Sequence, residues 1–258
     1  MDHNCEFWDE VSHKKLDDVD VRNARVDEIK QSYAHGVYEK VPIEKCWSAT
    51  GKKPIQVKWI DINKGDEVHQ EYRSRLVAKE IKLDKRNDLF AATPPLEAKK
   101  MLLSYAVTAG IGYLPGEEDE GMKLDFVDIS RAYFQADAIR DVYVELPDED
   151  WEEGMCGKLK KSMYGTRDAA QNWGEEYSRF MTESGFARGK SSPCVFWHPD
   201  REIRCVVHGD DVTVLSWETQ LDWFWAMIQK RLESKHRGRL GPGRNDKKQI
   251  RSLSHVHA

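Results

Sequence analysis

Two apolar runs that flank Gly209, Asp210 and Asp211 constrain the fold of this chain more than any other feature. The sequence Val-Val-His-Gly-Asp-Asp-Val-Thr-Val-Leu occupies residues 206–215. A glycine between two β-branched runs is typical of a tight β-hairpin. Adjacent carboxylates next to buried strands repel each other and are costly unless a cation or another partner neutralises them. The pattern therefore predicts a hairpin that aims both carboxylates at one point.

A third carboxylate, Asp128, closes an apolar strand that is predicted for residues 122–129. Asp128, Asp210 and Asp211 together would offer the hard oxygen ligands that Mg²⁺ prefers. Two such ions can activate a hydroxyl nucleophile and stabilise a leaving phosphate. However, most Asp-Asp pairs in loops bind nothing, and an Asp at the end of a strand is more often a cap or a turn residue. The pattern alone leaves those alternatives open.

The composition excludes several classes of protein. The chain has 258 residues, 40% hydrophobic and 33% charged, which is typical of a globular protein. It contains no apolar run near the roughly 20 residues that span a bilayer, and it does not begin with a signal peptide. Its five cysteines are odd in number and irregularly spaced, which favours reduced thiols. We therefore expect an intracellular location, in the cytoplasm or the nucleus.

The charge is unevenly distributed, although the net charge is only −5. Residues 117–153 contain 14 acidic side chains, whereas residues 230–251 contain nine Lys or Arg against two acids. An acidic centre with basic flanks suits a protein that binds metal in one place and phosphates in another. Solvated charged surfaces would give the same pattern.

The periodicity of the chain predicts a mixed α+β fold. We expect a polar, disordered lead-in at residues 1–24. Apolar residues at helical spacing predict helices at 25–40, 96–109, 167–184 and 221–232. Alternation and turn signals predict a hairpin from residues 55–62 and 71–79, and further strands at 142–147, 194–197 and 203–207. From residue 122 onward the order of elements is compatible with a ferredoxin-like βαββαβ unit.

Six sequence motifs resemble, in the right order, the reverse transcriptase domain of copia-type retrotransposons and their Pol polyproteins. The resemblance extends from about residue 26 to residue 235 and is more specific than any single motif. The motifs are VKW at 57–59 (family KWV), YRSRLVAK at 72–79 (YKARLVAKG), DISRAYF at 128–134 (DVxxAFL), VYVELP at 142–147 (VYMxxP), KLKKSMYGTRDAAQNW at 158–173 (CKLxKSLYGLKQAPRxW) and HGDD at 208–211 (YVDD).

The resemblance implies an RNA-directed DNA polymerase with a right-hand fold and assigns roles to particular residues. Asp128 and Asp210 would bind two Mg²⁺ ions, with Mn²⁺ as an alternative, and Asp211 would be the less essential neighbour. Tyr133 would exclude a 2′-hydroxyl. The other nucleotide-binding positions would be Lys58, Arg73, Arg75, Tyr164 and Gly165. We expect Arg73 and Arg75 to face opposite sides of their strand, with Arg75 favoured for the triphosphate.

The same resemblance implies a division into domains and a set of partners. Fingers would occupy residues 25–115, a ferredoxin-like palm 116–217, and a truncated thumb with a basic tail 218–258. The partners would be an RNA template, a DNA primer and deoxynucleoside triphosphates, without a membrane. The ribonuclease H and integrase of a parent polyprotein are expected elsewhere and not in this chain.

Departures from the family motifs leave other functions open. HGDD replaces YVDD, Glu80 replaces a glycine, and the proline of the YGLKQAP motif is absent after Gly165. One alternative is an inactive or host-adopted retroelement remnant that binds nucleic acid without catalysis. A second is an unrelated metal-dependent phosphohydrolase that uses the same acids. A zinc site made of Cys194, His198, Cys205 and His208 is a weaker alternative, because its ligand spacing is not a standard one.

Overall fold

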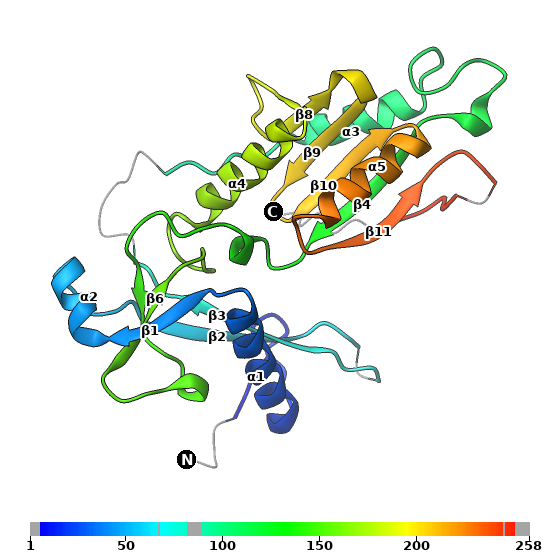
Figure 1. Cartoon of the computed structure of the whole chain (residues 1–258). Helices are drawn as coiled ribbons and strands as arrows, with labels where there is room; N and C mark the ends of the chain where they lie inside the picture. The colour runs from blue at the N-terminus through cyan, green and yellow to red at the C-terminus, as the bar shows by residue number, and fades with distance from the viewer. Residues whose placement is uncertain (1–5, 67, 82–88, 245, 251–258) are drawn as a thin grey trace. The chain divides into compact units, whose positions relative to one another are not determined.

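The chain forms two compact units, each built from two separate segments of sequence. In a computed structural model that describes residues 6–66, 68–81, 89–244 and 246–250, the first unit comprises residues 1–89 and 133–173. The second unit comprises residues 90–132 and 174–258. The chain thus passes from one unit to the other three times (Figure 1). Each unit thus recruits partners from distant parts of the sequence, and the expected division into fingers, palm and thumb stays a prediction.

The first unit opens with helix α1, Asp18–Ala34. The Asp17 side chain accepts hydrogen bonds from the backbone N–H groups of Val19 and Asp20, which satisfies donors that a helix start leaves unpaired. Val21 is fully buried and packs with Phe7 and Leu16. The prediction of a disordered lead-in was therefore wrong for its described part, residues 6–24. The expected helix at 25–40 begins earlier, after the cap at Asp17, and it ends earlier, before Gly36 with φ +61°.

Two antiparallel sheets complete the first unit. Strands β1 (Tyr38–Pro42), β6 (Met155–Leu159) and β5 (Tyr143–Val144) form one sheet, in that order, with helix α2 (Ile43–Thr50) following β1. Strands β2 (Val57–Asn63) and β3 (Tyr72–Ala78) form the second. The alternation of residues 55–62 and 71–79 predicted this hairpin.

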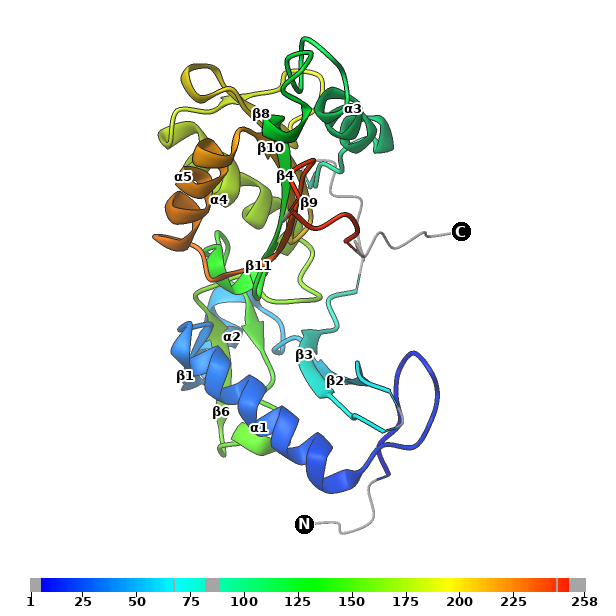
Figure 2. The ribbon, with the colours of Figure 1, turned by 90° about the vertical axis from the view of Figure 1, so that its right-hand side faces the viewer.

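The second unit is a six-stranded sheet with helices on both faces. The order of its strands is β11-β4-β10-β9-β8-β7, and all neighbours are antiparallel. Helices α4 and α5 lie on one face and α3 on the other (Figure 2). The strands are β4 (Lys123–Ile129), β7 (Ala187–Arg188), β8 (Val195–His198), β9 (Ile203–His208), β10 (Asp211–Ser216) and β11 (Ser234–Leu240). The helices are α3 (Leu96–Ala106), α4 (Ala169–Glu183), whose first residues belong to the first unit, and α5 (Glu218–Gln229).

The order of β4, α4, β9, β10, α5 and β11 along the chain is βαββαβ, and the four strands lie in the order fourth, first, third, second. The sequence indicated the order of these elements up to α5, but it did not predict β11, the fourth strand. Within residues 218–258, α5 and β11 belong to the second unit, and β11 pairs with β4 from Ser234 to Leu240. The expected start of a thumb in these residues stays a prediction.

One buried cluster packs α3 against the sheet of the second unit. Leu124, Val206 and Leu215 pack with Ala98 and Leu102 of α3 in the second unit. This core fixes the positions of β4, β9 and β10, the strands that carry the three predicted catalytic acids or lead into them.

Within the described residues, no helix combines the length and the apolar character that crossing a membrane requires.

Candidate active site

Asp128 and Asp211 lie directly opposite each other on neighbouring strands. Asp128 is the penultimate residue of β4, Asp211 is the first residue of β10, and the antiparallel register makes them Cα partners. Directly opposed residues project to the same face of a sheet, with Cβ atoms about 5 Å apart. The structure thus brings two carboxylates that are 83 positions apart in the sequence to one point on the sheet.

Asp210 occupies the turn of the β9–β10 hairpin next to this pair. His208 pairs with Asp211, so Gly209 and Asp210 form a two-residue loop. Gly209 has φ +65°, which glycine adopts without steric cost at the first position of such a turn. The Ile129 N–H donates to the Asp210 carbonyl oxygen at 2.8 Å, which ties the turn to the end of β4. All three predicted acids therefore lie at one edge of the second unit.

The electrostatics of the three acids favour a cation. Burial raises the pKa of Asp211, and the negative charges of Asp210 and Asp128 raise it further. The positive charges of Lys99, on α3, and Arg237, on β11, act in the opposite direction. A group of acids that raises the pKa of one of its members is stabilised by any cation that can reach it.

The fit of a metal to these residues is incomplete in this arrangement. Carboxylate oxygens are suitable ligands for Mg²⁺. However, no group of three or more His, Cys, Asp or Glu side chains among the described residues is arranged to hold a metal. Instead, Nη2 of Arg237 lies 3.0 Å from Oδ2 of Asp128. Metal binding at these acids stays a prediction, and so do their catalytic roles. The alternative zinc ligands are also described by the structure, and they are not arranged to hold a metal either: Cys194, His198, Cys205 and His208.

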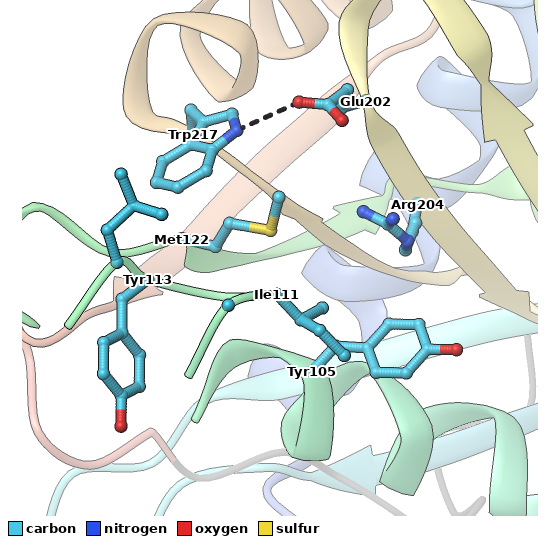
Figure 3. Close-up of a pocket in the computed structure, with 9 residues that line it drawn as sticks. Tyr105, Ile111, Tyr113, Met122, Glu202, Arg204 and Trp217 are labelled. Atoms are coloured by element: carbon cyan, nitrogen blue, oxygen red, sulfur yellow. Dashed lines mark hydrogen bonds between the residues drawn. The ribbon is translucent and has the colours of Figure 1, made fainter. Parts of the chain in front are cut away.

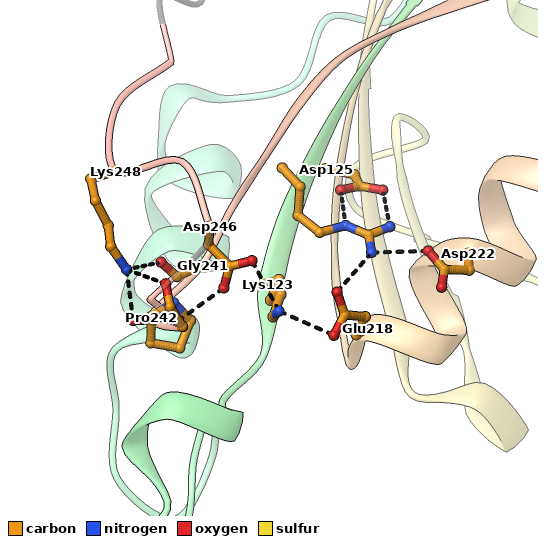
Figure 4. Close-up of polar contacts among 10 residues, drawn as sticks. Lys123, Asp125, Glu218, Asp222, Gly241, Pro242, Asp246 and Lys248 are labelled. Carbon is orange, nitrogen blue, oxygen red and sulfur yellow. Dashed lines mark hydrogen bonds and ion pairs between the residues drawn. The ribbon is translucent and has the colours of Figure 1, made fainter.

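The other face of β4 carries a second acid with a different environment. Asp125 is completely buried and accepts two hydrogen bonds from Arg239, from Nε at 2.7 Å and Nη2 at 2.9 Å. His236 Nε2 lies 3.2 Å from the same carboxylate. Arg239 also contacts Asp222 on α5 at 2.9 Å, so that the strand and the helix share one ion-pair network (Figure 4). Sequence patterns gave no sign of this network, because its members are spread over more than 100 positions.

The predicted nucleotide-binding residues lie in the first unit, and three of them form one aromatic cluster. The Arg75 guanidinium lies 4.6 Å from the centroid of the Tyr164 ring, and the Tyr133 ring lies 4.8 Å from the same ring. A guanidinium over an aromatic face is attracted by the ring quadrupole. The cluster therefore connects β3 with two segments that the sequence motifs singled out independently.

The expectation that Arg73 and Arg75 face opposite sides of their strand was wrong. Side chains alternate along a strand, so residues two positions apart share a face. In β3, Ser74, Leu76 and Ala78 are buried, and the two arginines lie on the other, partly exposed face. Both arginines therefore lie on the same face of β3. Lys58, on β2, is engaged with Glu10 at 2.7 Å in an exposed ion pair.

Gly165 has a structural reason for being glycine. Its φ is +83°, and a Cβ at this position would lie 2.0 Å from the Ala78 carbonyl oxygen. The Ala78 N–H in turn donates to the Tyr164 carbonyl oxygen at 2.8 Å. The Tyr164-Gly165 turn is thus pressed against the end of β3, where a side chain would not fit.

A cavity of about 430 Å³ lies elsewhere in the second unit (Figure 3). Its walls come from the end of α3 and the loop after it, from Met122 before β4, and from Trp217 after β10. Arg204 and Glu202, at the start of β9, also line it, and Trp217 Nε1 donates to Glu202 at 3.4 Å. None of the predicted site residues lines this cavity, so it is separate from the acids at the other end of these strands.

Comparisons with known proteins agree with these motifs. The model of the reverse transcriptase (RNA-dependent DNA polymerase) family matches residues 44–240, which is most of the chain. The chain is also 25% identical, over 203 residues, to the retrovirus-related Pol polyprotein from transposon TNT 1-94 of Nicotiana tabacum. That alignment covers 74% of this chain and only 14% of the polyprotein. The resemblance to copia-type elements is thereby confirmed, and the chain belongs to the reverse transcriptase (RNA-dependent DNA polymerase) family.

Proposed function

We propose that this chain is an RNA-directed DNA polymerase that transfers deoxynucleotides to the 3′-hydroxyl of a primer. The observation that carries the proposal is the direct opposition of Asp128 and Asp211 on β4 and β10, with Asp210 in the adjoining turn. Membership of the reverse transcriptase family supports the reaction class. In this proposal the sheet of the second unit is the core of the palm, and the β2–β3 hairpin belongs to the fingers.

The acids would act through divalent cations. Two Mg²⁺ ions, or Mn²⁺ in their place, would lower the pKa of the primer hydroxyl and neutralise the leaving pyrophosphate. Asp128 and Asp210 would hold these ions, and Asp211 would add negative charge beside them. The raised pKa of Asp211 supports this assignment, because burial and neighbouring acids are what a bound cation relieves.

The aromatic cluster of the first unit would serve the incoming nucleotide. Arg75 and Arg73 share a face of β3, and a guanidinium can donate two hydrogen bonds to a phosphate. Tyr133 packs against Tyr164 and is partly exposed. In this proposal its ring excludes a 2′-hydroxyl by a steric clash. In Tyr133→Ala, incorporation of ribonucleotides relative to deoxyribonucleotides should rise. An unchanged ratio with lower stability would make Tyr133 a core residue.

Primer extension is the direct test of the proposal. The purified chain should extend a DNA primer on an RNA template with Mg²⁺ and all four deoxynucleoside triphosphates, and the Asp128→Asn variant should not. Binding of the template–primer without extension would favour the rival function, a nucleic-acid-binding remnant. The departure from YVDD to HGDD and the pairing of Asp128 with Arg237 are the features on which that rival rests.

A further inference from the structure

The edge strand β11 departs from regular pairing next to the candidate active site. Lys235 is opposite Asp128 and His236 is opposite Val127, but Gly238 is opposite Phe126, so that Arg237 has no Cα partner on β4. Such a β-bulge sets two residues against one and redirects a side chain. Here the redirected side chain is Arg237, whose Nη2 lies 3.0 Å from Oδ2 of Asp128.

Gly238 fits the irregular backbone at this place. Its φ is +153°, and a Cβ would lie 2.9 Å from Cδ1 of Ile250 and 3.0 Å from Nζ of Lys247. Any other residue would have to displace these side chains. The bulge is therefore built into the packing of residues 234–250.

The ion pair of Arg237 is open to solvent, in contrast to that of its neighbour Arg239. The Arg237 side chain is 49% exposed and the Asp128 side chain 18% exposed. Arg239 is 18% exposed, and its partner Asp125 is inaccessible to solvent. An exposed guanidinium can leave its carboxylate for water at little cost, whereas a buried one cannot. The pair of Arg237 with Asp128 can therefore open without disturbing the sheet.

We propose that Arg237 is a built-in counterion of Asp128 and competes with divalent cations for this carboxylate. The inference rests on the proposed function, because it takes Asp128 as a metal ligand. A guanidinium at 3.0 Å neutralises the charge of Asp128 and occupies an oxygen that a metal would need. While Arg237 is paired with Asp128, its positive charge offsets the negative charge that Asp128 adds next to Asp211 and Asp210. A cation that binds through this oxygen must displace Arg237. Arg237 is thus a positioning residue that sets how much metal the site requires.

Metal binding to the intact chain tests the competition without relying on catalysis. Free Mn²⁺ is counted by electron paramagnetic resonance during titration of the wild-type chain, Arg237→Gln, Arg237→Lys and Lys235→Gln at low ionic strength. Removing one partner of an exposed ion pair changes a binding constant by about fivefold, so Arg237→Gln should bind Mn²⁺ about fivefold more tightly than the wild type. Arg237→Lys keeps the charge and should lie between the two.

Lys235→Gln is the matched control. This variant removes the same charge from the same strand. Lys235 is exposed and lies opposite Asp128 in register. It forms no ion pair in the part of the chain that the structure describes. Its effect through general electrostatics should stay below about twofold and should shrink as salt is added. In the Asp128→Asn background, Arg237→Gln should no longer tighten binding.

The results distinguish a failure of the proposed competition by Arg237 from a failure of the proposed polymerase function. If Arg237→Gln binds Mn²⁺ like the wild type, or no better than Lys235→Gln, the competition is wrong while the polymerase proposal stands. If Asp128→Asn leaves Mn²⁺ binding unchanged, or no variant binds Mn²⁺, Asp128 is not a metal ligand and both fail. Circular dichroism checks that each variant is folded. If Arg237→Gln does not fold, the comparison of Arg237→Lys with the wild type decides.

Discussion

The two faces of β4 carry an acid each, and β11 supplies an arginine to both, but the two pairs differ in every other respect. Asp125 is inaccessible to solvent and holds Arg239 through two hydrogen bonds, with His236 beside them. Asp128 is partly exposed, and a single nitrogen of the half-exposed Arg237 pairs with it.

The difference is one of burial and of hydrogen bonding, and it predicts different contributions to stability. A buried pair with all its hydrogen bonds formed holds elements together, and removing one partner leaves an uncompensated charge. An open pair contributes little to stability and can be exchanged for another ligand. Burial and the number of hydrogen bonds thus give the same two residue types, on the same two strands, different expected contributions to stability.

The largest expected effect is on catalysis, in Asp128→Asn. If Asp128 holds a metal ion, primer extension should fall by about 10³-fold, which corresponds to about 4 kcal/mol of transition-state stabilisation. The free energy of unfolding, measured in urea, should change little, because the ion pair with Arg237 is open. A large loss of stability in this variant would remove the distinction between the two faces.

The next effect is on stability, in Asp125→Asn. This change leaves Arg239 without its main charge partner, and we expect unfolding to become easier by about 3 kcal/mol in urea titrations. The double variant Asp125→Asn with Arg239→Gln should lose less than the sum of the two single changes. Strict additivity would show that the two residues do not act as a pair.

A smaller effect should depend on pH, in Asp211→Asn. The pKa of Asp211 is raised by burial and by Asp210 and Asp128, so its charged form destabilises the fold above that pKa. This cost disappears as the pH falls below the pKa of the unfolded chain. At pH 7 the variant should therefore be more stable than the wild type, by less than about 1 kcal/mol after screening by solvent.

The gain should vanish in acid, near pH 3, where Asp211 is protonated in the folded and unfolded wild-type chain alike. Thermal melts at several pH values measure it. A gain that grows on acidification would have the wrong sign and would contradict the assigned cause.

The smallest effect should follow Asp222→Asn, at the rim of the Asp125 network. Asp222 is 66% exposed and contacts Arg239 at 2.9 Å. Exposed ion pairs of this kind contribute less than about 1 kcal/mol, and we expect a loss of no more than 0.5 kcal/mol in urea titrations. A loss as large as that of Asp125→Asn would mean that solvent does not screen the rim of the network.

The sequence predicted the β2–β3 hairpin and the β9–β10 hairpin because their signals are local. Alternation, a turn sequence and β-branched residues all lie within about ten positions of one another. The neighbourhood of Asp128 and Asp210 was inferred from the resemblance to a family, not from spacing. The prediction that Arg73 and Arg75 face opposite sides of β3 failed through a misapplied rule of strand periodicity and could have been made correctly.

Other features could not be predicted from local patterns. Residues 234–240 read Ser-Lys-His-Arg-Gly-Arg-Leu and have no apolar alternation. They form a strand because they pair with the edge of β4 and because the buried Asp125 attracts Arg239. The start of α1 lies in a polar stretch where the cap at Asp17 and the burial of Val21 replace an apolar stripe. Both depend on tertiary contacts that propensity does not encode.

The interleaving of the two units has a consequence for synthesis on the ribosome. The first unit needs residues 133–173 to complete its three-stranded sheet, and the second needs residues 174–258 to surround β4. A nascent chain released after β4 would contain neither a finished first unit nor a finished second one. Its unpaired strand edges would invite aggregation. A premature stop codon before residue 173 should therefore yield insoluble or rapidly degraded fragments, because no independently folding half precedes it in the sequence.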